Sequence, residues 1–185
     1  MAKKIKIYDL NLEYETDYRS IKYPRLEFKT GKLLLVLPKN YGEEKNLIEK
    51  HKEWIYKKSL IIDLAKKEAK NKKIKPIHEK RFKDLVVNLA KKFSKEMDVK
   101  INKIYFKNLK SKWASCTPKR NLTFNILARY LPKSLIKYIV LHEIVHLKEK
   151  KHNAEFWKLI ARKFRDYERK EKELLAYWFY VRDLI

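Results

Sequence analysis

Two histidines and a glutamate in the stretch 141–147 have the types and spacing that chemistry requires. His142 and His146 are four residues apart, so on a helix they share one face, with Cβ atoms about 6 Å apart, and both imidazoles can bind one ion. Glu143 is rotated about a quarter turn around the helix, away from the ion but within reach of a water bound to it. The spacing predicts a zinc site with Glu143 as the base.

The surroundings of this motif strengthen the prediction. Between Leu135 and Leu147 the only clearly polar residues are Lys137, the two histidines and the glutamate, so we expect the helix to run through the core. Burying two imidazoles and a carboxylate costs on the order of several kcal/mol unless they are paired or bind a metal. A structural cluster of hydrogen-bonded His and Glu is the alternative, but it requires neither this spacing nor another histidine downstream.

That further histidine is His152, which follows the motif and is the predicted third ligand. Asn153 is a predicted N-cap of the next helix, so a short loop can return His152 over the motif helix. Glu149 and Glu155 are the alternatives, because other zinc hydrolases with this helix use a downstream glutamate. Ligand spacing favours His152, since Glu149 is expected to point away on the motif helix. Cys116 is a further candidate ligand, although a lone thiol more often serves packing.

The ligand set predicts the reaction. Three neutral imidazoles leave one exchangeable position on four-coordinate zinc, which is typical of a catalytic site. Zinc lowers the pKa of bound water to about 7, and Glu143 can take its proton and pass it to a leaving amine. We therefore expect one Zn²⁺ ion and hydrolysis of a peptide bond by a metal-activated water. The sequence does not distinguish hydrolysis of a peptide bond from hydrolysis of a non-peptide amide.

The composition restricts the class of protein. A chain of 185 residues is long enough for one domain with a sizeable core, with or without a small appendage. The single cysteine excludes an internal disulfide framework, and no apolar run reaches the ~18 residues of a membrane span. The first residues are too charged for a signal peptide. We expect a soluble cytoplasmic protein without a membrane partner.

The formal net charge of +24 predicts attraction to polyanions such as nucleic acid. Only nine of the 47 basic residues are arginine, and the lysines are spread along the predicted helices, as on a generally solvated surface. Nucleic acid is therefore a candidate partner beside a peptide or protein substrate. The sequence does not specify an oligomeric state.

The first third of the chain is predicted to form strands and then one long helix. Period-two apolar residues indicate strands in 3–14, and 25–29 and 32–37 predict a hairpin. Apolar pairs at seven-residue spacing predict a helix over 43–71. The break at 72–76 predicts a β-rich N-terminal part with a long helix, 1–75, and a part with the metal motif, 76–185, although both can form one continuous domain.

The second part is predicted to combine helices with a small sheet. Helical periodicity covers 79–97, Pro132 and Ser134 open the motif helix, and 171–185 forms a last helix. Residues 103–109 and 121–127 are predicted strands, joined by a connection rich in turn formers. The fold class is α+β, with the active-site helices packed on a small antiparallel sheet.

The strands indicate where a substrate binds. An extended chain usually pairs with an exposed strand edge, which satisfies its backbone groups without reading its sequence. We hypothesise that the strand 121–127 holds the substrate across the metal. Trp113, Thr123 and Asn125 are the candidate substrate-binding residues on and near this strand.

Several segments together resemble the YgjP-like family of predicted zinc metallopeptidases, relatives of the SprT-like proteases. The resemblance covers most of the chain and is carried by Lys112-Trp113-Ala114-Ser115-Cys116, Asn121-Leu122-Thr123-Phe124-Asn125, Tyr138 to Leu147, His152 and Glu155-Phe156-Trp157. Tyr18-Arg19-Ser20, Val36-Leu37-Pro38 and Trp54-Ile55 extend it into the N-terminal part. Ala114 stands where the family usually has glycine, and alanine is the mildest replacement at such a turn.

The resemblance implies a zincin-like metallopeptidase domain over 76–185. It implies zinc bound by His142, His146 and His152, with Glu143 as the catalytic base. Because SprT-like relatives cleave proteins attached to DNA, it also offers an alternative in which this basic chain is a DNA-linked protease. The remaining alternative is a nucleic-acid-binding protein whose metal site is structural.

Overall fold

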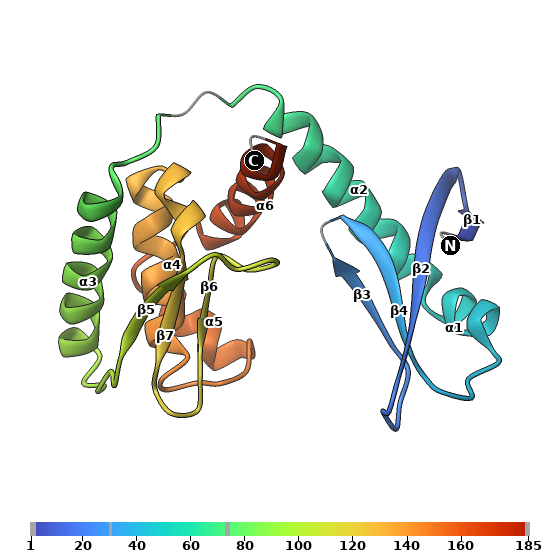
Figure 1. Cartoon of the computed structure of the whole chain (residues 1–185), viewed down its shortest axis with the longest axis horizontal. Coiled ribbons are helices and arrows are strands. Elements are labelled where there is room, and N and C mark those ends of the chain that lie inside the picture. Colours follow the sequence, from blue (N-terminus) through green and yellow to red (C-terminus); the bar gives the residue numbers. More distant parts are fainter. Residues whose placement is uncertain (1–2, 30, 73–74, 184–185) are drawn as a thin grey trace. The chain divides into compact units, whose positions relative to one another are not determined.

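The computed structural model describes residues 3–29, 31–72 and 75–183, and the chain divides into two compact units, Met1–Lys67 and Glu68–Ile185 (Figure 1). Each unit has its own hydrophobic core. The division falls inside a helix, a few residues before the predicted break at 72–76, of which residues 73 and 74 lie outside the described part. No helix of the described residues has both the length and the apolar character needed to cross a membrane.

A four-stranded sheet forms most of the first unit. Its strands are β1 (Lys3–Ile7), β2 (Leu10–Arg19), β3 (Arg25–Lys29) and β4 (Lys32–Pro38), in the order β1-β2-β4-β3. The central pair β2 and β4 is parallel, and both outer pairs are antiparallel hairpins. All five residues from Leu33 to Leu37 are buried, as expected for the most apolar strand at the centre of a sheet. The predicted strands and hairpin are confirmed.

Two helices cover this sheet where one was predicted. They are α1 (Glu44–Lys50) and α2 (Lys52–Ala69), and the backbone of His51 between them leaves the helical region at φ −115° and ψ 14°. Leu47 and Ile48 before the break, and Ile55 after it, are all buried against the sheet. Because the apolar pairs keep their seven-residue spacing across His51, the periodicity carried no sign of the interruption.

The second unit places helices around a three-stranded sheet. Its elements are α3 (Glu79–Glu96), β5 (Ile104–Lys107), β6 (Ala114–Cys116), β7 (Leu122–Asn125), the 3-10 helix η1 (Ile126–Tyr130), α4 (Lys133–Val145), α5 (Ala154–Ala161) and α6 (Tyr167–Asp183). The α+β class and the predicted helices are confirmed. The last helix begins four residues earlier than predicted, at Tyr167, and the predicted end at 184–185 lies outside the described residues.

The sheet of this unit corrects two expectations. Its order is β5-β7-β6, with β5 parallel and β6 antiparallel to β7, so the sheet is mixed and not purely antiparallel. The strand predicted over 121–127 is therefore central, and both its edges are occupied by neighbouring strands. The edge strands are β5 and β6, and of the two only β6 contributes residues to the pocket lining described below. β6 lies inside the connection predicted as a turn, because three residues are too few to show a period of two.

The helix α4 is the centre of the second unit. It packs against α3, α5, α6 and β6, and Figure 1 shows it between α3 and α6. Every residue from Leu135 to Val145 is buried except Lys137 and His142, which is half-buried. The prediction of a helix apolar on nearly all sides is confirmed, and this burial fixes the position of the side chains that the helix carries.

Candidate metal centre and active site

The end of α4 brings the two motif histidines to one face. His142 lies in the last turn, and His146 is the C-cap residue, whose backbone is still helical at φ −61° and ψ −17°. The amide of His146 donates to the carbonyl of His142 at 3.2 Å, so the four-residue spacing keeps its helical geometry. Both imidazoles therefore project from the same face, as the spacing predicts.

His152 joins them from the start of α5. The carboxamide of Asn153 accepts a hydrogen bond from the amide of Phe156 at 3.0 Å, which is the predicted N-cap. The imidazole of His152 stacks on Trp157 with ring centroids 5.6 Å apart, and meets the edge of Phe156 at 4.6 Å. The cap and the two aromatic rings hold His152 over the C-terminal end of α4.

Three imidazole nitrogens converge at this point. The candidate ligand atoms of His142, His146 and His152 all lie within 4.8 Å of one another, and Nε2 of His142 is 2.9 Å from Nε2 of His152. Two ligands on a tetrahedral zinc ion with bonds of about 2.1 Å are about 3.4 Å apart, so the three residues fit such an ion after a small adjustment. Among the described residues, no other group of three or more His, Cys, Asp or Glu side chains has the geometry to hold a metal ion.

The surroundings favour the neutral form of His142 and His146, which is the form that binds a metal. Burial lowers the pKa of His142 to about 3, and the neighbouring His146 and His152 add to the effect. Burial also lowers the pKa of His146, while the carbonyl of Glu149 acts in the opposite direction. Nδ1 of His146 lies 3.1 Å from that carbonyl oxygen, which leaves its Nε2 for the ion.

A carboxylate on α6 faces the outer nitrogen of His142. Oε1 of Glu171 lies 3.8 Å from Nδ1 of His142 and accepts a hydrogen bond of 2.6 Å from the hydroxyl of Tyr138. No sequence pattern indicates this residue, because Glu171 lies on another helix, far along the chain from the motif.

The alternative ligands point elsewhere. Oε1 of Glu149 accepts from the amide of Lys151 at 3.2 Å, and the carboxylate of Glu155 lies 3.6 Å from Lys158. Cys116 lines the same pocket as the histidines but does not belong to the cluster of ligand atoms. Burial, together with the charge of Glu143, raises the pKa of its thiol to about 11, so the thiol stays protonated at neutral pH.

Glu143 is the buried acid of the site. Its side chain is only 6% exposed, and its Oε2 atom has no hydrogen-bond partner among the described residues. Burial raises the pKa of this carboxyl group to about 8, while the positive charge of Lys112 acts in the opposite direction. A carboxyl group with a pKa near neutrality can both accept and return a proton, as a general base must.

A pocket of about 560 Å³ opens at these residues. Its walls come from the end of α4, the loop to α5, the strand β6 and the connections on both sides of β6. The lining residues are Lys112, Ala114, Ser115, Cys116, Thr117, Pro118, Arg120, His142, Glu143, His146, Leu147, Lys150 and His152. Sequence reasoning found the histidines and Glu143 but missed the wall formed by β6, because that strand was not predicted.

The three candidate substrate-binding residues do not line this pocket. Trp113 donates its indole N–H to the carbonyl of Leu174 at 3.1 Å, which ties β6 to α6. Asn125 is fully buried and holds the chain before β6 through its side-chain amide. Thr123 lies on the central strand β7, opposite Tyr105 on one side and Ser115 on the other.

A buried helix with two histidines and an acid, a third histidine and an adjoining pocket define the architecture of a metal-dependent hydrolase. The family model described as YgjP-like, metallopeptidase domain, matches residues 59–177, and the chain belongs to this family. The resemblance stated above is thereby confirmed, and the protein is a metallopeptidase by family.

Two solved structures are similar to parts of the chain. The metallopeptidase zymogen abylysin of Pyrococcus abyssi shares 23% identity over 48% of this chain and 88% of its own, with a TM-score of 0.43. The metallopeptidase zymogen jannalysin of Methanocaldococcus jannaschii shares 30% identity over 56% of this chain and 97% of its own, with a TM-score of 0.42. No curated protein sequence matches the chain.

Proposed function

We propose that this metallopeptidase is zinc-dependent and hydrolyses peptide bonds with Glu143 as the general base. One observation carries the proposal: three imidazole nitrogens lie within 4.8 Å of one another, and the same pocket contains the buried carboxyl group of Glu143. His142, His146 and His152 hold a single ion. Three nitrogen ligands from protein suit zinc and leave a fourth position for exchange, which distinguishes a catalytic site from a structural one.

A bound zinc ion supplies Lewis-acid chemistry, polarising the scissile carbonyl group and making water a stronger acid. The protein residues provide the proton transfers. Glu143 accepts a proton from water at its carboxylate and then donates it to the nitrogen that leaves as an amine. Burial favours both steps, because the raised pKa makes the carboxylate a stronger base. Burial also stabilises the protonated carboxyl group, which holds the proton until the amine nitrogen accepts it.

The free edge of β6 replaces β7 as the proposed substrate-binding strand. β6 is paired on one side only, and Ala114, Ser115 and Cys116 all line the pocket beside Glu143. Its unpaired backbone groups can form main-chain hydrogen bonds with an extended peptide, which positions the scissile bond without selecting its sequence. A complex with a substrate analogue that showed no pairing with β6 would refute this part of the proposal.

The Glu143→Gln variant tests the mechanism. Glutamine keeps the size of the side chain but cannot accept the proton, so the rate of hydrolysis of a denatured protein should fall by about 10² to 10⁴. The affinity for zinc and the urea midpoint should stay close to those of the wild type. Glu149→Gln is the matched control, because its carboxylate faces Lys151 and lies outside the pocket lining.

Removing the metal provides a separate test. A chelator should abolish hydrolysis, and added zinc should restore it in the wild type and in Glu149→Gln, but not in Glu143→Gln. Hydrolysis that persists in Glu143→Gln would rule out this residue as the base. Hydrolysis that persists in the metal-free wild type would rule out the zinc mechanism.

A further inference from the structure

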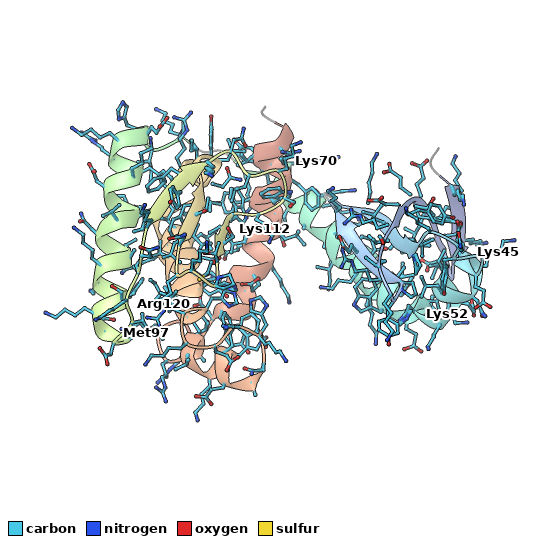
Figure 2. The ribbon with its side chains drawn as sticks, turned by 60° about the horizontal axis from the view of Figure 1, so that its bottom comes forward. Lys45, Lys52, Lys70, Met97, Lys112 and Arg120 are labelled. Atoms are coloured by element: carbon cyan, nitrogen blue, oxygen red, sulfur yellow. The ribbon has the colours of Figure 1, made fainter. Side chains whose placement is uncertain are left out.

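Three cationic side chains surround the pocket at the metal centre. Lys112 lies in the connection before β6, Arg120 in the connection after it, and Lys150 in the loop between α4 and α5; the first two are labelled in Figure 2. The only acid in the pocket lining is Glu143, whose side chain is buried. The exposed part of the pocket wall is therefore positively charged.

None of these three side chains forms an ion pair with an acidic residue of the described part of the chain. Elsewhere in the same unit basic residues do have acidic partners, as in the pair of Lys163 with Glu96 at 2.6 Å. The three pocket cations remain available to an anionic ligand.

Their positions relative to β6 indicate how such a ligand lies. Lys112 precedes the strand by two residues, and Arg120 follows its last residue, Cys116, by four. A three-residue strand is about 10 Å long, so a peptide paired with its free edge has one cation near each end. Lys150 lines the pocket from the loop between His146 and His152. Lys112 is also close enough to the carboxyl group of Glu143 to oppose the effect of burial on its pKa.

We propose that the pocket selects peptide segments that carry aspartate or glutamate side chains on both sides of the scissile bond. This inference rests on the proposed function and names its substrate class. Carboxylates of the substrate form ion pairs with the three cations, whereas lysine or arginine at the same positions is repelled. Each exposed pair contributes modestly, so selectivity arises from two or three of them acting together.

A general effect of net charge is the competing explanation. Residues 68–185 contain 31 basic and 13 acidic residues, so the whole unit attracts anions, including nucleic acid. Selectivity that arises in the pocket depends on Lys112, Arg120 and Lys150. Selectivity that arises from net charge depends equally on lysines elsewhere, such as those on α3. The two explanations therefore predict different results when equal numbers of charges are removed from the two places.

The test uses one peptide that the wild type cleaves, made in three versions with glutamate, glutamine or lysine on both sides of the cleaved bond. We expect kcat/KM for the glutamate version to exceed that of the glutamine version about tenfold, and the lysine version to be the poorest. In the triple variant Lys112→Gln, Arg120→Gln, Lys150→Gln, the ratio between the glutamate and glutamine versions should fall to about one.

The matched control is the triple variant Lys91→Gln, Lys92→Gln, Lys95→Gln, which removes the same charge from the exposed lysines of α3. It should keep the tenfold ratio. A ratio that falls equally in both triple variants, or that is already about one in the wild type, would overturn the inference. Using a ratio also cancels any effect of the substitutions on the rate of the chemical step.

A binding measurement separates this inference from the proposed function. With Glu143→Gln as the background, the affinity for each uncleaved peptide should follow the same order and depend on the same three cations. Absence of hydrolysis for every peptide, with the order of binding preserved, would contradict the proposed function alone. Hydrolysis without any preference would contradict the inference alone.

If an oligonucleotide such as poly(dT) displaced the glutamate peptide and bound through the same three residues, the site would be one for nucleic acid, and the inference would be overturned.

Discussion

Nδ1 of His142 on α4 lies 3.8 Å from Oε1 of Glu171 on α6, and the same oxygen accepts a 2.6 Å hydrogen bond from Tyr138. A carboxylate at the outer nitrogen of a metal-binding imidazole fixes the tautomer and the orientation of the ring. Glu171 is thus placed to direct Nε2 of His142 towards His146 and His152. The relationship gives α6 a part in the proposed metal centre, although α6 contributes no candidate ligand.

The Glu171→Gln variant should therefore bind zinc about 10- to 100-fold more weakly than the wild type. Glutamine keeps the side-chain length but removes the negative charge that lies 3.8 Å from Nδ1 of His142. Competition with a chromophoric chelator measures the affinity directly. Glu173→Gln on the same helix is the control, since Glu173 lies 3.7 Å from Arg169 and forms no ion pair with a histidine of the described residues. Equal affinities of both variants would contradict the role assigned to Glu171.

The identity of the third ligand is open to a similar comparison. His152→Ala removes a proposed ligand, so it should weaken zinc binding more than Glu171→Gln does, by more than about 100-fold. Glu149→Gln, Glu155→Gln and Cys116→Ser should each retain the affinity of the wild type, because none of these side chains belongs to the cluster of ligand atoms. Loss of affinity in one of these three variants would show that the ligand set is different.

Much of this centre could be predicted because it is local in sequence. His142, Glu143 and His146 share one helix, whose geometry follows from the spacing alone. His152 was predicted from ligand spacing, and the N-cap asparagine after it indicated that a short loop could return it over the motif helix. Glu171 could not be predicted, because nothing in the pattern of α6 indicates which residue on another helix it faces.

The order of the strands is also absent from the sequence pattern. The strands β5 and β7 were predicted from their alternating residues, but alternation does not show which neighbours a strand has. The substrate was therefore assigned to β7, which is central. β6 was missed because Ala114–Cys116 is short and contains no alternation. Its place at the free edge depends on the tertiary packing against α4.

The structure leads to a different expectation for Asn125 than the sequence did. Its side-chain amide donates to the carbonyls of Leu109 at 2.9 Å and Lys112 at 2.8 Å, and its oxygen accepts from the amide of Leu127 at 3.1 Å. Asn125→Ala leaves three backbone groups without these partners in a buried place. The free energy of unfolding should fall by about 3 kcal/mol, as measured by urea unfolding.

Asn102→Ala is the control for this substitution. Asn102 is exposed and makes one side-chain hydrogen bond of 3.4 Å to the carbonyl of Lys119, so its loss should change the free energy of unfolding by less than about 0.5 kcal/mol. If Asn125→Ala were as stable as Asn102→Ala but had a raised KM, Asn125 would act on the substrate after all.

The first unit contains an acid-sensitive link at Glu44. Its carboxylate accepts hydrogen bonds from Lys3 at 2.6 Å and from Tyr18 at 2.7 Å, which joins α1 to the strands β1 and β2. These bonds hold the pKa of Glu44 below its ordinary value, the bond from Lys3 having the largest effect. Because the pKa is lower in the folded state, the stabilisation is fully present above the unfolded pKa. It disappears as the pH falls through the folded value.

Glu44→Gln should therefore lower the melting temperature by about 3 °C at pH 7, and the difference from the wild type should be smaller at pH 3. Circular dichroism followed with temperature at both pH values measures it. Glu53→Gln at the start of α2 is the control, because Glu53 forms no ion pair within the described residues and should give the same small difference at both pH values. A difference between Glu44→Gln and the wild type that was as large at pH 3 as at pH 7 would mean that the ionised carboxylate does not supply the stabilisation.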